Sequence, residues 1–243
     1  MSPATRRGLL LAALISVGWL ASLACLWFDW TSMAPGWLLL AVLVRSVLQT
    51  GLFIIGHDAM HGVLVPGSRL LNDRIGAGVL ALYAALPYGL CLRKHQLHHR
   101  HSGTPQDPDW HAPGESSALA WYQHFMAGYL RPGQMTALLL GWAGLAWCSS
   151  ASAVLLFCTL PLLLSSLQLF VVGTYLPHRQ SNDATNDHRA TSLDLAEWLS
   201  LLACFHFGYH LEHHQSPELA WHQLPQRHRE GRAQAATLAV SAH

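Results

Sequence analysis

The chain has 243 residues, of which 51% are hydrophobic and 11% are charged, and its formal net charge is +1. This composition is too apolar for an ordinary soluble domain, and so small a net charge gives no reason to expect a nucleic acid partner. The five cysteines form no Cys-x-x-Cys pair, so neither a disulfide framework nor an iron-sulfur cluster is indicated.

The first apolar block lies near the start of the chain. Residues 8–28 carry no charged side chain over 21 positions, and a hydrocarbon core needs about 20 apolar residues. We therefore expect a membrane span here. A cleaved signal peptide, with Arg6 and Arg7 at its positive end, is the alternative, but the apolar run is longer than the usual core of a signal peptide.

A second predicted span covers residues 36–56 and is interrupted only by Arg45. His57 and His61 follow directly after the carboxyl-terminal end of this span. A charge inside a membrane is costly and faces protein rather than lipid. A substrate contact or a structural pair with a carboxylate would account for Arg45, and we favour the structural pair.

The uncharged residues 75–92 run directly into His95. A single crossing would place His57 and His95 on opposite sides of the membrane. We therefore expect this stretch to dip and return, or to lie along the interface, and its glycines together with Pro87 suit such an interrupted path. We interpret Gly76 and Gly78 as sites of close helix packing rather than as a nucleotide fingerprint, because no strand precedes them.

The next apolar block, residues 135–176, carries no charge over 42 positions. It is long enough for two spans, at about residues 135–149 and 152–176, and residues 193–205 then form a shorter interfacial or re-entrant helix. The sequence therefore predicts an all-α integral membrane protein. Its single domain, residues 1–243, would have four transmembrane helices in two hairpins and a histidine-rich cap that binds two metals.

The basic residues indicate how this bundle is oriented. Thirteen of the fourteen Lys and Arg residues fall on the side that would hold the histidine clusters, and Arg45 lies within a span. Because cytoplasmic loops are enriched in Lys and Arg, that side is predicted to be cytoplasmic, together with both chain termini.

Eight histidines occur in three clusters with helical spacing. Two stand at i and i+4, and two further sets stand at i, i+3 and i+4, so each set shares one face if its segment is helical. Eight imidazoles exceed one zinc site and suggest two adjacent metal ions, which could be iron, zinc, copper or nickel. The eight candidate ligands are His57, His61, His95, His98, His99, His210, His213 and His214.

Carboxylates near these clusters could accept the outer ring N–H of ligating histidines. The alternative for each is a solvated loop residue. The candidates are Asp58, Asp107, Asp109 and Glu212. Two metals held by neutral imidazoles at a membrane surface suit oxidation of an unactivated C–H bond by iron and dioxygen, with a substrate that arrives from lipid.

The histidine pattern resembles that of the membrane fatty acid desaturase and hydroxylase superfamily of di-iron enzymes, in particular the bacterial beta-carotene ketolases. The resemblance covers about residues 51–225. The stretches that carry it are residues 53–62 (FIIGHDAMHG), 94–101 (KHQLHHRH), 107–111 (DPDWH), 165–170 (SSLQLF), 173–179 (GTYLPHR) and 206–214 (HFGYHLEHH).

This resemblance implies oxygenation at C4 of a beta-ionone ring in the bacterial inner membrane, with the active site on the cytoplasmic side. Two hydroxylations of one carbon would form a geminal diol, which loses water to give a ketone. Products would be echinenone and canthaxanthin from beta-carotene, or astaxanthin from a 3-hydroxylated substrate. The cofactors would be two non-haem irons and dioxygen, with electrons from a ferredoxin-like donor. Arg93, Lys94 and Arg100 could attract such an acidic partner, and contact with lipid headgroups is the alternative role for these side chains.

The resemblance also implies a ninth ligand at the end of the fourth predicted span, His178. His206 is the competing candidate, because it stands at i−4 from His210. If the segment is a continuous helix, His206 lies roughly 10 to 12 Å along the axis from His213 and His214. We therefore expect His178 to be a ligand and His206 to be outside the metal shell.

Three other functions remain open at this stage. A carotenoid hydroxylase and a lipid desaturase belong to the same superfamily. A histidine-rich membrane metal transporter belongs to another class, but transporters place their sites near the middle of the bilayer. Here every cluster lies at a span end or in a loop, which favours an enzyme.

Overall fold

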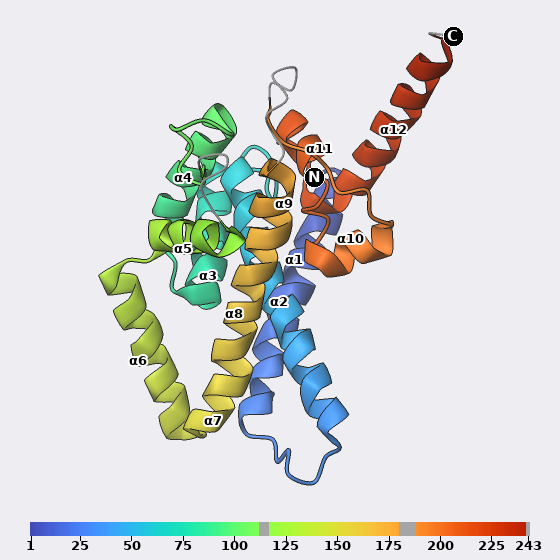
Figure 1. Cartoon of the computed structure of the whole chain (residues 1–243). Coiled ribbons are helices and arrows are strands. Elements are labelled where there is room, and N and C mark those ends of the chain that lie inside the picture. Colours follow the sequence, from blue (N-terminus) through green and yellow to red (C-terminus); the bar gives the residue numbers. More distant parts are fainter. Residues whose placement is uncertain (112–116, 180–187, 242–243) are drawn as a thin grey trace.

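The computed structural model describes residues 1–111, 117–179 and 188–241, with side chains up to residue 237. These residues form helices and connecting turns without a β-strand (Figure 1), as the sequence predicts. The long helices run up and down, and the shorter ones gather at the end that holds both termini. The α-helices are α1 (Pro3–Ser22), α2 (Pro35–His61), α3 (Arg69–Ala84), α4 (Tyr88–His101), α5 (Ala118–Tyr129), α6 (Pro132–Cys148), α7 (Ala151–Val154), α8 (Leu160–Phe170), α9 (Leu176–His178), α10 (Glu197–Cys204), α11 (His210–Gln215) and α12 (Leu224–Ser241).

Within the part of the chain that the structure describes, three helical segments are long and apolar enough to cross a membrane. They are Pro3–Leu26, Pro35–His61 and Ala151–His178, of 24, 27 and 28 residues. The third predicted span, residues 135–149, corresponds to α6, which has 17 residues. In Figure 1, α6 and α8 are the arms of a hairpin joined at α7. The predicted number of four crossings and the cytoplasmic orientation remain predictions.

The chain bends sharply where the sequence predicts an interrupted path. Helices α3 and α4 meet at 102°, across a break of three residues. Ala85 ends α3 in the left-handed conformation, with φ 52°, and Pro87 precedes α4. The bend brings α4 back over the end of α2, so His57 and His95 lie at the same end of the bundle. A broken span and a re-entrant loop both fit this shape.

Close packing joins α2 to α3 and α4. A Cβ atom on Gly76 would lie 2.2 Å from the Tyr88 ring and 2.9 Å from the Ala59 Cβ, so this glycine permits the contact. Gly78 has open space around it and is not needed for packing. The close-packing interpretation is therefore confirmed for Gly76 and wrong for Gly78.

The segment from α7 to α9 is one continuous helix with two π-helical turns, Leu155–Thr159 and Val171–Tyr175. Pro161 and Pro177 follow these turns. Proline has no N–H for the carbonyl four residues earlier, and a π turn makes room for its ring. The carbonyl of Phe157 is therefore left free by Pro161, and it accepts a hydrogen bond from Arg45 Nε.

Arg45 is buried in the protein, as predicted, but its partners differ from the prediction. Its Nη1 donates to Ser22 Oγ at 2.7 Å, and its guanidinium lies 5.4 Å from the centroid of the Trp19 ring. Within the described residues, no carboxylate lies at ion-pair distance from it. Arg45 therefore joins α1, α2 and the π-helical turn Leu155–Thr159 through a carbonyl and a hydroxyl group rather than through a carboxylate pair.

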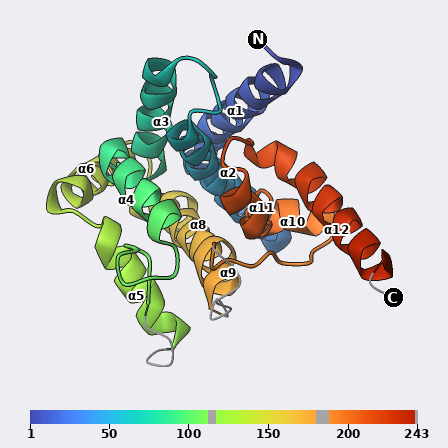
Figure 2. The same ribbon diagram turned by 90° about the horizontal axis from the view of Figure 1, so that it is seen from above.

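The predicted helix at residues 193–205 is shorter in the structure. It is α10, which exposes Trp198 and Leu202. Phe205 and His206 then take left-handed conformations, with φ 48° and 64°, and a new helix, α11, begins at His210. Seen from above, α4, α9 and α11 lie around the end of α2 (Figure 2).

Candidate metal centre

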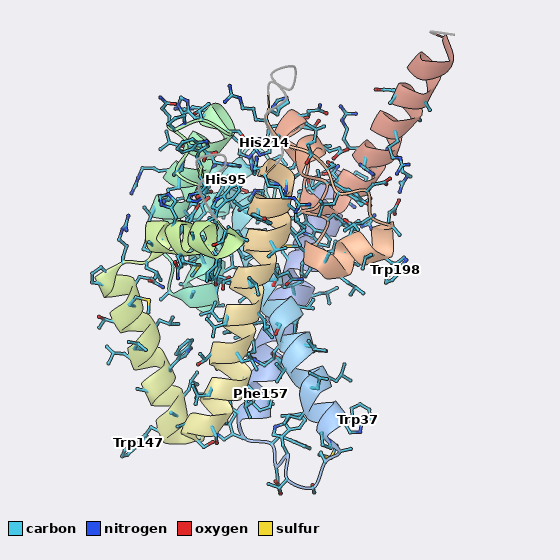
Figure 3. The ribbon with its side chains drawn as sticks, in the orientation of Figure 1. Trp37, His95, Trp147, Phe157, Trp198 and His214 are labelled. Carbon is cyan, nitrogen blue, oxygen red and sulfur yellow. The ribbon has the colours of Figure 1, made fainter. Side chains whose placement is uncertain are left out.

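The structure brings all nine histidines predicted as ligands to one end of the bundle. Figure 3 shows two of them, His95 of α4 and His214 of α11, close together at that end. The nine divide into two groups, and within each group one ring nitrogen from every member lies within 4.8 Å of the others. The first group is His57, His61, His95, His99 and His213, and the second is His98, His178, His210 and His214.

Each element contributes its histidines for a local reason. Helix α2 ends at Gly62, which takes the left-handed φ of 77°, so His57 and His61 occupy its last turns on one face. Helix α4 carries three histidines at i, i+3 and i+4, and α11 does the same. His98 and His99 point to different groups, because adjacent helical residues are about 100° apart.

In the first group, which we call the five-histidine cluster, ring nitrogens face each other directly. His61 Nε2 lies 2.6 Å from His95 Nε2, and His99 Nε2 lies 3.0 Å from His213 Nε2. The His57 ring lies 4.4 Å from the His95 ring, and neither of its buried nitrogens has a hydrogen-bond partner within the described residues.

In the second group, the four-histidine cluster, all members are buried. The Nε2 atoms of His178 and His214 lie 3.0 and 3.1 Å from that of His210. The His98 Nε2 atom lies 3.2 Å from that of His214.

These distances fit two metal ions. Ligand nitrogens at right angles around one ion, each about 2.1 Å from it, would lie about 3.0 Å apart. The protonation state fits as well, because burial, followed by repulsion from neighbouring imidazoles, lowers the pKa of His210, His213 and His214 well below its usual value. These three imidazoles are therefore neutral near pH 7, which is the form that binds metal.

Two members of the four-histidine cluster are oriented by outer partners. Asp107 accepts from His98 Nδ1 through both oxygens at 3.0 Å. The Arg189 carbonyl accepts from His178 Nδ1 at 2.9 Å, so that nitrogen carries the proton, and Nε2, which faces His210, is the nitrogen that could bind a metal. Burial acts to raise the pKa of Asp107, but the hydrogen bond and charge of His98, together with the backbone N–H groups of Asp109 and Gly103, outweigh burial and lower this pKa.

The other three of the four proposed carboxylates make different contacts. Asp58 Oδ1 lies 3.8 Å from His57 Nδ1, too far for a hydrogen bond, and Asp58 accepts from the Trp221 N–H at 3.3 Å. Asp109 accepts from the Tyr129 hydroxyl at 3.1 Å, and burial raises its pKa.

Glu212 is also turned away from the nine histidines. It accepts from the Ser192 hydroxyl, and it lies 2.7 Å from His228 Nδ1. Spacing alone could not select Asp107 among the four acids, because the loop after α4 decides which of them reaches a ring nitrogen. The Arg189 carbonyl has no sequence signal at all.

His206 lies outside both clusters. Its ring stacks on those of Tyr209 and Trp221, with centroids 5.8 and 6.0 Å away, and burial lowers its pKa to about 4. The premise that the segment is a continuous helix from His206 onward is wrong, because Phe205 and His206 interrupt it. This turn, rather than distance along a helix, separates His206 from the cluster histidines of α11.

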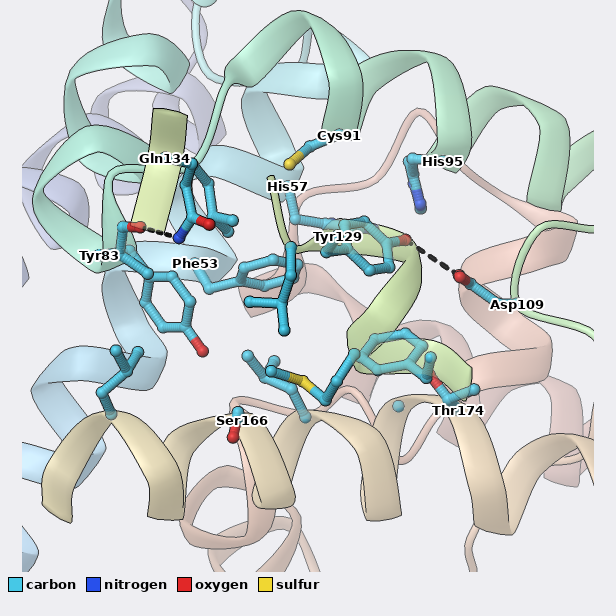
Figure 4. A pocket seen from close by; sticks show the side chains of 18 of the residues that line it. Phe53, His57, Tyr83, Cys91, His95, Asp109, Tyr129, Gln134, Ser166 and Thr174 are labelled. Atoms are coloured by element: carbon cyan, nitrogen blue, oxygen red, sulfur yellow. Dashed lines mark hydrogen bonds between the residues drawn. The ribbon is translucent and has the colours of Figure 1, made fainter. Parts of the chain in front are cut away.

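A largely apolar cavity of about 380 Å³ ends at the two clusters (Figure 4). Four of the nine histidines line it, and most of the rest of its wall comes from α2, α3, α5, α6 and α8. Figure 4 shows His57 and His95 at one side, with the hydrogen-bonded Asp109 and Tyr129 nearby. The cluster histidines in its wall are His57, His95, His98 and His210.

Comparison with known proteins gives matches over nearly the whole chain. The fatty acid desaturase family matches residues 29–137 and 129–242. A beta-carotene ketolase of a Paracoccus species is 40% identical over 93% of this chain and 94% of its own length. A zeaxanthin 4-ketolase of Chlamydomonas reinhardtii is 37% identical over 79% of this chain and 45% of its own length.

Proposed function

The chain belongs to the fatty acid desaturase family, and we propose that it is a carotenoid ketolase that introduces a keto group at C4 of beta-ionone rings. Its substrates are beta-carotene, which gives echinenone and canthaxanthin, and 3-hydroxylated carotenoids such as zeaxanthin, which give astaxanthin. One observation of the structure carries the proposal: four cluster histidines form the end of a largely apolar cavity. The similarity to named ketolases supports this choice of substrate.

The nine histidines would hold two irons, one in each cluster, with the outer partners of His98 and His178 fixing their rings. When bound, the two irons supply the activation of dioxygen needed to oxidise an unactivated C–H bond. Imidazole also binds zinc well, so reconstitution distinguishes the two metals. Ketolase activity should return with iron and not with zinc.

The protein's own residues position the substrate. The apolar wall of the cavity orients the ring so that C4 faces His57, His95, His98 and His210, and it excludes water from the reacting carbon. Two successive hydroxylations at C4 each place one oxygen atom of dioxygen on carbon, while the other leaves as water with two electrons and two protons. The geminal diol then loses water to give the ketone.

The electrons come from an external donor in this proposal. Helix α4 carries His95, His98 and His99 toward the clusters, while Arg93 and Arg100 on the same helix are exposed. An acidic ferredoxin-like protein would bind this positive side of α4, the helix that also carries three of the cluster histidines. Lys94 contributes less, because its ammonium lies over the Tyr129 ring at 4.5 Å.

We place the clusters at the cytoplasmic side of a bacterial inner membrane. Both termini lie at the end of the bundle that holds the clusters. The concentration of Lys and Arg at this end supports the orientation. Labelling single cysteines from outside should reach residues 29–35 and 149–152 only, and labelling near His95 from outside would contradict the shared site.

Pigment analysis tests the function. The chain is expressed in a beta-carotene-producing bacterium beside a His214→Ala variant as the inactive control, because His214 belongs to the cluster of four histidines. We expect echinenone and canthaxanthin from the unmodified chain and unchanged beta-carotene from the variant. Hydroxylated carotenoids without ketones would favour the hydroxylase alternative. Unchanged beta-carotene with full iron content would count against carotenoid chemistry and leave the lipid desaturase.

A further inference from the structure

A second cavity adjoins the one that ends at the histidines. It has a volume of about 310 Å³ and lies among α1, α2, α3, α6 and α8, deeper in the bundle. The two cavities share part of their walls, so they follow one another along the groove between α6 and the other spans. The shared residues are Tyr83, Leu138, Trp142 and Leu162.

Together the two cavities extend far along α2. His57 lines the first and Arg45 lines the second. Twelve residues separate them in one helix, which corresponds to about 18 Å at 1.5 Å per residue. The combined space is therefore long and narrow, and it runs away from the histidine clusters toward the opposite end of the bundle.

The polar groups of the second cavity are already paired within the protein. Gln49 accepts from Trp19 Nε1 at 2.6 Å and donates to the Tyr83 carbonyl. Arg45 is 1% exposed and donates to Ser22 and to the Phe157 carbonyl. The cavity is therefore suited to an apolar ligand. The buried guanidinium of Arg45 in its wall favours a ligand with an electron-rich π system.

One face of α6 closes this cavity. Its lining residues recur at helical spacing, so they share one side of the helix. Gly141 in the middle of this face leaves the space open, because a Cβ atom there would meet no atom within 4 Å. The residues of this face are Ala137, Leu138, Gly141, Trp142 and Leu145.

We propose that the second cavity is a subsite for the remote part of the carotenoid polyene, occupied while the reacting ring lies beside the histidines. This inference rests on the proposed function and specifies how the substrate lies. A rigid conjugated chain attached to a ring in the first cavity must continue beyond it, and the adjoining cavity offers an apolar path beside Arg45. The subsite would therefore select long carotenoids.

Filling the second cavity without disturbing the metal centre tests the proposal. Gly141→Phe places a ring in open space inside the cavity, and Gly144→Phe is the matched control. Gly144 lies on the same helix, a Cβ atom there also meets nothing within 4 Å, and it lines neither cavity. Both variants are produced in the beta-carotene-producing bacterium, and iron and copurifying carotenoid are measured per folded protein.

We expect Gly141→Phe to keep its iron and to copurify with about tenfold less carotenoid than Gly144→Phe, because an added side chain in a fitted space costs binding energy. Ketone yield should fall in parallel. Equal carotenoid in the two variants would overturn the proposal. If Gly141→Phe does not accumulate, Ala137→Phe replaces it, since Ala137 is exposed and lines the same cavity.

The unmodified chain separates this inference from the proposed function. An unmodified chain that binds carotenoid but forms no ketone would refute the ketolase assignment alone. The amounts of carotenoid bound by Gly141→Phe and Gly144→Phe would then still show whether the second cavity is a carotenoid subsite. An unmodified chain that binds no carotenoid would refute both.

Discussion

The two histidine clusters differ in how firmly the protein holds them. The four-histidine cluster is buried throughout, and Asp107 and the Arg189 carbonyl orient His98 and His178 from outside. The five-histidine cluster has three partly exposed members, and both nitrogens of His57 lack hydrogen-bond partners within the described residues.

This difference shows two ways of holding a metal. The four-histidine cluster has no spare ligand, but outer partners fix two of its four rings, those of His98 and His178, before a metal arrives. The five-histidine cluster has one more ligand and fewer outer contacts, so its rings depend on the metal itself for their orientation. Loss of one histidine should therefore be more damaging in the four-histidine cluster.

The largest expected effect comes from removing a ligand in each cluster. His214→Ala leaves three ligands in the four-histidine cluster and should reduce iron from about two to about one per chain, with loss of ketone formation. His61→Ala leaves four ligands in the five-histidine cluster and should retain more iron. Iron per folded protein measures both. Equal iron loss in the two variants would contradict the difference between the clusters.

The next effect compares His178 with His206. His178→Ala removes a member of the four-histidine cluster, so it should lose about one iron and lower activity at least about a hundredfold. His206→Ala removes only stacking on Tyr209 and Trp221 and should keep both irons. Iron per folded protein again distinguishes the two residues. Loss of iron from His206→Ala but not from His178→Ala would show that His206, rather than His178, is the ligand.

A smaller effect is expected at Asp107, which positions His98 without entering either cluster. Asp107→Ala should lower metal affinity or activity about 10- to 100-fold. Asp107→Asn keeps a carbonyl oxygen that can accept from His98 Nδ1 and should recover part of the loss. Iron affinity by competition with a chelator measures this, and equal affinity in the two variants would argue against an orienting hydrogen bond.

The smallest effect is expected at Glu212. It contacts Ser192 and His228 rather than a cluster histidine, and the contact with His228 joins α11 to α12. Glu212→Gln should therefore lower the melting temperature while iron content stays near that of the unmodified chain. A loss of iron as large as that in Asp107→Ala would show that Glu212 orients a ligand after all.

Sequence reasoning found the parts of the site that follow helical periodicity. The spacing in α4 and α11 predicts histidines on shared faces, and the uncharged runs predict the three long helices. His178 stands alone in sequence, so only the resemblance indicated it. The left-handed turn at Phe205 and His206 lies outside any periodic pattern, and the loop that brings Asp107 to His98 depends on tertiary contacts. Such features can be found only in the folded structure, because they depend on contacts between segments that are distant in sequence.

The central claim is that two irons occupy two separate histidine clusters, and anomalous X-ray scattering at the iron edge tests it most directly. Crystals of iron-loaded, active protein should show two anomalous peaks. One should lie among His57, His61, His95, His99 and His213, and the other among His98, His178, His210 and His214. A single peak, or a peak between His98, Asp107 and Asp109 in place of the second, would contradict the account.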